Sequence, residues 1–160
     1  MWLKPDYNIE SIYTIDLDEL KSLGVEAILF DLDSTIMASG SGCYSTQTLE
    51  WLDKVRKDFF IGVISNNYNS VYVEKVRAVT DFPALFDAKK PNPVPSKKFM
   101  AEHGLTPEKT VLVGDRPLTD ILCGKNLGCK TILVDSITAK TENLPTRWVR
   151  KLERCCIKNK

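Results

Sequence analysis

The chain has 160 residues, of which 43% are hydrophobic and 27% are charged, and its net charge is +1. This composition is typical of a globular protein with one core, and it excludes disorder, a collagen-like repeat and a membrane bundle. We expect a single domain over residues 1–160, and the near-neutral charge gives no reason to expect a nucleic acid partner. The segment Met1–Asp6 lacks the pattern of a secretory signal and the five cysteines form no zinc motif, so we expect a cytoplasmic protein with free thiols.

Short apolar runs alternate with longer amphipathic stretches along the chain, a pattern that predicts βα units around a parallel sheet. The expected strands are Glu26–Phe30, Phe60–Ile64, Ala84–Phe86, Thr110–Val113 and Thr131–Val134. A first helix is expected after Asp16, which forms a capping box with Glu19, and the later helices at Ser45–Lys57, Val71–Val79, Ser96–Glu102, Leu118–Leu127 and Pro145–Cys155. The sequence therefore predicts an α/β fold with one doubly wound, Rossmann-like parallel sheet and helices on both faces.

Polar side chains follow four of the expected strands, and they are the residues that we expect to carry the chemistry. They are Asp31, Asp33 and Thr35 after the first strand, Ser65, Asn66 and Asn67 after the second, Lys89 and Lys90 after the third, and Asp115 and Asp120 after the fourth. Because ligands of such sheets bind at the carboxyl ends of the strands, we expect these groups to converge on one crevice.

Four neighbouring carboxylates repel one another unless a cation lies among them, and a small cluster of hard oxygen ligands suits Mg²⁺. A lysine beside that cluster is useful when an anion such as phosphate also binds. A metal, a lysine and amide donors together are the recurring apparatus of phosphoryl transfer, where electrostatic stabilisation does most of the catalysis.

The motifs Asp31-x-Asp33-x-Thr35, Ser65, Lys90-Pro91 and Gly114-Asp115-x4-Asp120 are similar, in the same order, to the four motifs of the haloacid dehalogenase (HAD) superfamily of phosphotransferases. Over nearly the whole chain the sequence also resembles the YqeG-type phosphatases of subfamily IIIA. Two positions differ from that family: Ser34 stands where it usually has Asn, and Arg116-Pro117 stands where it usually has Gln and an aliphatic residue.

The resemblance implies a role for each motif residue. Asp31 is the expected nucleophile, which forms an aspartyl-phosphate, and Asp33 is the expected general acid and base. Lys90 is the third expected catalytic residue, because it would neutralise the charge of the phosphoryl group and of the nucleophile. The expected phosphate-binding residues are Thr35, Ser65, Asn66 and Lys90. The expected ligands of Mg²⁺ are Asp31, Asp115, the carbonyl group of Asp33, and Asp120, which binds the metal through a water or instead holds Lys90.

Two other functions deserve comparison. A receiver domain also uses a doubly wound sheet, Mg²⁺ and a phosphorylated aspartate, but its lysine follows the fifth strand, whereas Lys90 follows the third expected strand. A catalytically weak HAD module that serves as a phosphate-binding or protein-interaction scaffold is the alternative from another class. The presence of every motif side chain favours the enzyme.

The gaps between motifs are too short for a cap domain, because 29 residues separate Thr35 from Ser65 and 24 separate Ser65 from Lys90. An open site favours a large or lipid substrate. Family resemblance offers phosphatidylglycerophosphate as one candidate, since a mitochondrial relative of this subfamily acts on it.

The C-terminal segment Arg147–Lys160 has six basic residues and one acidic residue, a net charge of +5, with Trp148, Leu152 and Ile157 interspersed. Two interpretations remain open. The segment could make a peripheral contact with an anionic membrane, or it could be a terminal helix that packs on the sheet with a solvated basic face. The sequence indicates neither the physiological substrate nor the oligomeric state.

Overall fold

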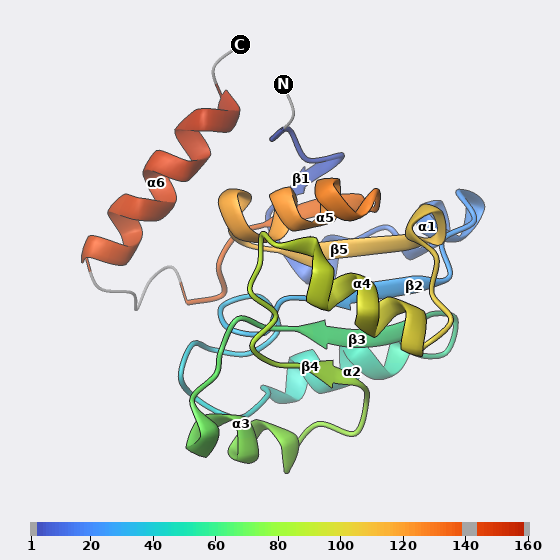
Figure 1. The fold of residues 1–160 in the computed structure, drawn as a ribbon, viewed down its shortest axis with the longest axis horizontal. Coiled ribbons are helices and arrows are strands. Elements are labelled where there is room, and N and C mark those ends of the chain that lie inside the picture. Colours follow the sequence, from blue (N-terminus) through green and yellow to red (C-terminus); the bar gives the residue numbers. More distant parts are fainter. Residues whose placement is uncertain (1–2, 139–143, 159–160) are drawn as a thin grey trace.

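The computed structural model describes residues 3–138 and 144–158. They form a six-stranded, fully parallel sheet in the order β1-β6-β5-β2-β3-β4, with helices packed on its faces (Figure 1). The strands are β1 (Tyr7–Ile9), β2 (Ala27–Phe30), β3 (Phe60–Ile64), β4 (Ala84–Leu85), β5 (Thr110–Gly114) and β6 (Lys130–Val134). The predicted parallel α/β sheet is confirmed, and five strands lie within one residue of their expected bounds. Strand β1 was not predicted, because this edge strand has only three residues and none of them is fully buried.

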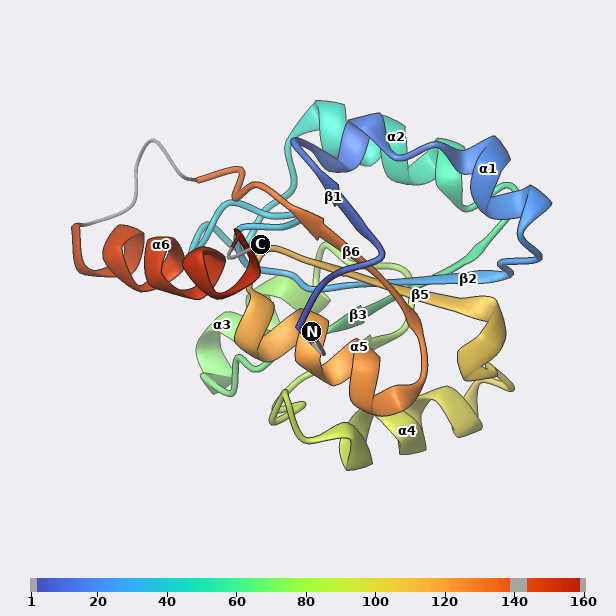
Figure 2. The same cartoon turned by 90° about the horizontal axis from the view of Figure 1, so that it is seen from above.

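The helices are α1 (Leu17–Ser22), α2 (Thr46–Val55), α3 (Ser70–Arg77), α4 (Pro93–Glu102), α5 (Leu122–Leu127) and α6 (Leu144–Lys158). Short 3₁₀ turns, η1 (Ile12–Thr14) and η2 (Pro107–Lys109), and one π-helical turn, η3 (Pro117–Ile121), join them. Helices α1 and α2 cover one face of the sheet, and α4 and α5 cover the other (Figure 2). The doubly wound arrangement predicted from the sequence is therefore confirmed.

Two apolar clusters hold these layers together. One joins Ile28 and Phe30 of β2 to Leu20 of α1 and Leu52 of α2, and the other joins strand residues to Phe99 of α4. Burying each such side chain contributes about 1.5–3 kcal/mol before the entropy of ordering is counted. Strands β2 and β5 are buried along their whole length, as strands in the middle of a parallel sheet usually are.

Capping residues and prolines mark where several of the helices begin. Asp16 caps α1, since its carboxylate accepts a hydrogen bond of 2.9 Å from the backbone of Glu19, as expected. Helix α4 begins at Pro93, three residues earlier than expected, because a proline lacks the N–H that the first turn of a helix leaves unpaired anyway. The single helix expected over Leu118–Leu127 is a π-helical turn followed by α5.

The expected apolar face of α3 is wrong in detail. Val76 is fully buried, but Val71 is 80% exposed and Val79 is 46% exposed, so only the middle of the helix packs on the core. In α2, Leu49 was also expected on the apolar face, but it is 45% exposed. The neighbouring Thr48 is buried in its place, with its hydroxyl 2.8 Å from that of Tyr13.

The topology brings β2, β3 and β5 side by side, so their carboxyl ends meet at one edge. The chain runs from β2 outward to β3 and β4 and then returns to β5 on the other side of β2. This reversal leaves a crevice at the ends of β2 and β5, where ligands bind in open α/β sheets. Residues 36–89 contain only α2, β3, α3, β4 and loops, so no cap domain covers the crevice from this part of the chain. Among the described helices, none has both the length and the hydropathy needed to cross a membrane.

Candidate active site

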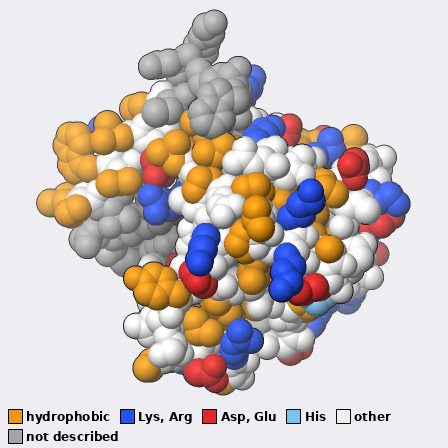
Figure 3. Space-filling view, in the orientation of Figure 1, with side chains coloured by type: hydrophobic (Ala, Val, Ile, Leu, Met, Phe, Trp, Pro, Cys, Tyr) orange, Lys and Arg blue, Asp and Glu red, His pale blue; other side chains and the backbone are white. Residues whose placement is uncertain are grey.

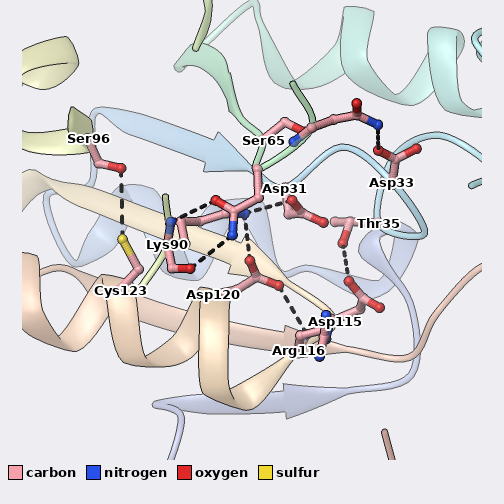
Figure 4. Close-up of polar contacts among 12 residues, drawn as sticks. Asp31, Asp33, Thr35, Ser65, Lys90, Ser96, Asp115, Arg116, Asp120 and Cys123 are labelled. Atoms are coloured by element: carbon pink, nitrogen blue, oxygen red, sulfur yellow. Dashed lines mark hydrogen bonds and ion pairs between the residues drawn. The ribbon is translucent and has the colours of Figure 1, made fainter. Parts of the chain in front are cut away.

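Lys90 occupies the centre of the site and links two of the carboxylates (Figure 4). Its Nζ atom lies 2.6 Å from Oδ1 of Asp31, at the end of β2, and 2.6 Å from Oδ1 of Asp120, in η3. The Lys90 side chain is 1% exposed and the Asp31 side chain is 14% exposed, so the ammonium is enclosed while Asp31 can be reached from the cleft. The structure thus joins three of the expected site residues from separate elements.

Asn66 fixes the backbone of Lys90. Its Oδ1 accepts a hydrogen bond of 2.7 Å from the Lys90 N–H, and its Nδ2 donates one of 2.9 Å to the Lys90 carbonyl. Both polar atoms of the Asn66 side chain therefore hold the lysine in place. The expectation that Asn66 binds phosphate stays a prediction, whereas its contact with Lys90 was not foreseen.

Asp120 is positioned by two further features of the loop after β5. Its Oδ2 accepts a hydrogen bond of 3.0 Å from the backbone N–H of Arg116. A Cβ atom on Gly114 would lie only 2.3 Å from Cγ of Asp120, so a glycine at this position is what lets the carboxylate approach the strand end. Of the two expected roles of Asp120, holding Lys90 is the one that the geometry displays.

Asp115 and Thr35 contact each other and lie outside the residues that line the cleft. The Thr35 hydroxyl donates a hydrogen bond of 3.1 Å to Oδ1 of Asp115, and both residues are buried. Asp31, Asp115 and Asp120 each offer a carboxylate oxygen, and these three oxygens lie within 4.8 Å of one another. Three clustered carboxylates beside one ammonium leave an excess of negative charge, and hard oxygen donors of this kind fit a small divalent cation.

The pKa values of the central pair follow from burial and charge. Burial disfavours ionisation and raises the pKa of Asp31 to about 6, although the Lys90 ammonium acts in the opposite direction. Burial alone would lower the pKa of Lys90, but the charges of Asp120 and Asp31 outweigh it and raise that pKa above its usual value. Lys90 therefore stays protonated and is a fixed positive charge beside Asp31.

Asp33 points its carboxylate to donors outside this cluster. The Tyr72 hydroxyl donates a hydrogen bond of 2.6 Å to its Oδ1, and Nδ2 of Asn67 donates one of 3.3 Å to its Oδ2. The Gly40 N–H adds a third, at 3.3 Å. Burial and the bond to Asp33 raise the pKa of Tyr72, so the phenol remains a donor. The carboxylate expected to handle the proton is thus held in a defined orientation.

The cleft holds about 290 Å³ and brings most of the predicted residues to one surface. Its lining is Asp31, Asp33, Ser34, Ser39, Ser65, Asn66, Asn67, Lys90, Arg116, Thr119 and Asp120. Ser65 lines the cleft together with Asp31, and its Oγ accepts a hydrogen bond of 3.1 Å from the Asn67 N–H. Lys89, the other lysine after the third expected strand, lies outside this lining with a side chain that is 64% exposed.

Ser34 has a backbone conformation that few side chains adopt. Its φ angle is +70°, in the left-handed region that asparagine tolerates better than most residues. This explains the Asn that is usual at the position in the YqeG-type family. In this chain the Ser34 hydroxyl instead lies 2.7 Å from that of Thr138, so it ties the first motif to the segment after β6.

Three residues of the site were not predicted as functional. Tyr72 was not predicted as a site residue, because only the valines of its helix were considered. The helix of a βα unit begins at the carboxyl edge of the sheet, so its first turn lies close to the site. Arg116 was noted only as a departure from the family. Its Nη2 lies 2.6 Å from Oε1 of Glu153 in α6, and Glu153 is 4% exposed. The signal for that pair was the lone acid in a basic segment.

The sheet order and the acid–lysine–acid cluster at its carboxyl edge agree with what the resemblance to the haloacid dehalogenase superfamily implies. A family model described as HAD-hydrolase-like matches residues 88–152. The chain is 29% identical to the probable phosphatase YqeG of Bacillus subtilis over 150 residues, which cover 94% of this chain and 87% of that protein. It is 25% identical to the chloroplastic/mitochondrial phosphatidylglycerophosphate phosphatase 1 of Arabidopsis thaliana over 96% of this chain, which spans 47% of that protein. A predicted HAD-like hydrolase from Porphyromonas gingivalis shares the fold, with a TM-score of 0.58 and 16% identity over 81% of this chain and 98% of that one.

Together, the family-model match and the similarity to YqeG support a phosphatase of the haloacid dehalogenase superfamily.

Proposed function

We propose that the chain hydrolyses a phosphate monoester in a Mg²⁺-dependent reaction that passes through an aspartyl-phosphate on Asp31. The observation that carries this proposal is the contact of the buried Lys90 ammonium with Asp31 and Asp120, 2.6 Å from each. A fixed positive charge beside a carboxylate that faces the cleft serves to bind a phosphoryl group and to offset the charge of an attacking aspartate.

The donor set supports a divalent cation. Asp31 and Asp115 would hold it, with the Asp33 carbonyl and Asp120 completing the oxygen ligands. When bound, Mg²⁺ supplies positive charge that offsets the phosphoryl oxygens and keeps the neighbouring carboxylates ionised.

The chain's own residues account for both steps. In the first, an Asp31 oxygen forms a bond to phosphorus while the bond from phosphorus to the leaving oxygen breaks, and the Asp33 carboxyl gives that oxygen its proton. In the second, the Asp33 carboxylate takes a proton from water, the water oxygen attacks phosphorus, and the bond to Asp31 breaks. Phosphate leaves, and both aspartates return to their starting states. Ser65 and Thr35 are the proposed hydroxyl donors near the phosphoryl group.

We further propose that the substrate is large and presents its phosphate at an accessible end, as a phospholipid headgroup does. Residues 36–89 add no cap over the cleft, so a bulky substrate is not excluded by the fold. Similarity to an enzyme named for phosphatidylglycerophosphate supports a lipid phosphate monoester of that kind.

Hydrolysis of an aryl phosphate in the presence of Mg²⁺ tests the reaction itself. We expect turnover that EDTA abolishes and that the Asp31→Asn variant lacks. Asp87→Asn is a matched control, because Asp87 is exposed near the same loops, lies outside the cleft lining and has a φ of +50° that asparagine accepts. Turnover that survives both chelation and Asp31→Asn would contradict the mechanism. Absence of turnover on any phosphate ester would favour a phosphate-binding scaffold.

A further inference from the structure

Helix α6 presents apolar side chains to solvent. Leu144, Trp148 and Leu152 lie four residues apart, which places them along one side of the helix, and they are 68%, 63% and 60% exposed. In Figure 3 hydrophobic side chains gather over the outer side of this helix, at the upper left. We call Leu144, Trp148 and Leu152 the α6 stripe.

The opposite side of α6 attaches to the protein through charge. Glu153 is nearly fully buried and pairs with Arg116. Arg154 pairs with Asp135 after β6 and also donates a hydrogen bond of 2.7 Å to the Val134 carbonyl. A helix on a globular protein usually buries its apolar side and solvates its polar side. Among its described side chains, helix α6 has the reverse arrangement, with Leu144, Trp148 and Leu152 exposed and Glu153 buried.

The exposed surface around the α6 stripe is basic. Arg147 and Lys151 are exposed beside it, and the Lys151 ammonium lies 5.8 Å from the centre of the Trp148 ring. Residues 144–158 contain five basic residues and a single acidic one, Glu153, whose carboxylate is engaged by Arg116. Apolar side chains with a tryptophan, bordered by lysine and arginine, are the chemistry of a helix that lies at an anionic lipid–water interface.

We propose that α6 docks the protein on an anionic lipid surface, with the α6 stripe in contact with the lipid and Arg147 and Lys151 near the headgroups. The helix lies beyond the carboxyl ends of the strands, on the side toward which the β3 arrow points in Figure 1. Arg116, which holds α6, also lines the catalytic cleft. Docking through α6 therefore brings the cleft close to the lipid. As an account of substrate access, this inference rests on the proposed function.

A second copy of the chain is a less suitable occupant of the same surface. Two α6 helices packed stripe to stripe would bring their Arg147 and Lys151 side chains together, and like charges at close range oppose association. Anionic headgroups complement those charges instead.

Sedimentation with vesicles of phosphatidylcholine containing about one quarter phosphatidylglycerol tests the surface. We expect the intact protein to bind these vesicles, to ignore pure phosphatidylcholine, and to lose at least about tenfold in binding when NaCl rises from about 0.05 M to about 0.5 M. The Trp148→Glu/Leu152→Glu variant should not bind. Val94→Glu, at a valine of α4 that is 68% exposed, is the matched control and should bind like the unmodified chain. Binding should also shift the tryptophan emission to shorter wavelength, and Trp148→Phe should remove most of that shift while binding persists.

Failure to bind anionic vesicles, or equal binding by the Trp148→Glu/Leu152→Glu variant, would overturn the inference. Another contradicting result would be a dimer in light scattering that the Trp148→Glu/Leu152→Glu variant converts to monomers while its vesicle binding stays unchanged. Turnover of a soluble aryl phosphate should be equal in the unmodified chain and the stripe variant, which verifies that the variant is folded. If vesicle binding behaves as expected while turnover is absent from both, the docking surface stands and the proposed function fails.

Discussion

The Tyr72 hydroxyl donates a 2.6 Å hydrogen bond to Oδ1 of Asp33, and this bond connects the first turn of α3 to the proposed general acid and base. Asn67 and Gly40 donate to the same carboxylate at longer distances. Tyr72 does not line the cleft. It therefore acts on the reaction through the orientation of Asp33, as a positioning residue.

We expect Tyr72→Phe to lower kcat by about 3- to 10-fold with little change in KM, because the lost hydrogen bond is worth about 0.5–1.5 kcal/mol and the phenol does not touch the phosphoryl group. Steady-state kinetics on an alkyl phosphate measure this. Tyr44→Phe is the matched control, since it removes another partly buried phenol whose hydroxyl lies 2.9 Å from that of Thr80. Equal kinetic effects in the two variants would mean that the loss is structural.

Asp33→Asn should slow turnover by about 100-fold or more, the usual scale of general acid–base assistance, while phosphate binding is retained. The rate of the first step should fall least with an aryl phosphate, because the phenolate leaving group departs without a proton. Pre-steady-state kinetics should therefore show a burst of phenol followed by slow hydrolysis. Unaltered turnover would assign the proton transfer to another group.

The contribution of Asp31 to the stability of the metal-free protein should increase as the pH falls from about 6 to about 4. Burial raises the pKa of Asp31 from 3.8 to about 6. This group therefore stabilises the fold most below its unfolded pKa, and the contribution is lost as the pH rises through about 6. Melting temperatures in EDTA should show the slope, and Asp31→Asn should flatten it. Added Mg²⁺ should raise the melting temperature near neutral pH, because it binds the folded state. A slope that is identical in both proteins would contradict the assignment.

Arg116→Ala should loosen α6, because it leaves the buried Glu153 carboxylate without its ion pair. Hydrogen exchange in residues 144–158 should accelerate at least tenfold, because an uncompensated buried charge lowers the free energy of local unfolding by more than about 1 kcal/mol. Arg56→Ala is the control. Arg56 makes a similar two-nitrogen pair with Asp81, at 3.1 Å for each contact, but the Asp81 side chain is 74% exposed and water can replace the arginine. Unchanged exchange in α6 would show that the helix is held by other contacts.

The sequence predicts the sheet and the acidic cluster because both follow from local patterns. Apolar runs such as Ile61–Ile64 are typical of inner strands of a parallel sheet, and each motif residue follows a strand in the sequence. Asn66 and Tyr72 could not be assigned in this way. Their roles depend on partners that lie 24 and 39 residues away along the chain, Lys90 and Asp33. The basic composition of α6 was visible in the sequence, but the direction of its apolar side depends on the Arg116–Glu153 pair, which joins distant parts of the chain.

The identity of the phosphorylated residue tests the central claim most directly. The Asp33→Asn variant is mixed with Mg²⁺ and an aryl phosphate, quenched in acid during the burst and digested for mass spectrometry. We expect a phosphoryl group on Asp31 that is absent when EDTA is present and absent from the Asp31→Asn/Asp33→Asn double variant. A burst of phenol without an adduct on Asp31, or an adduct on another residue, would contradict it.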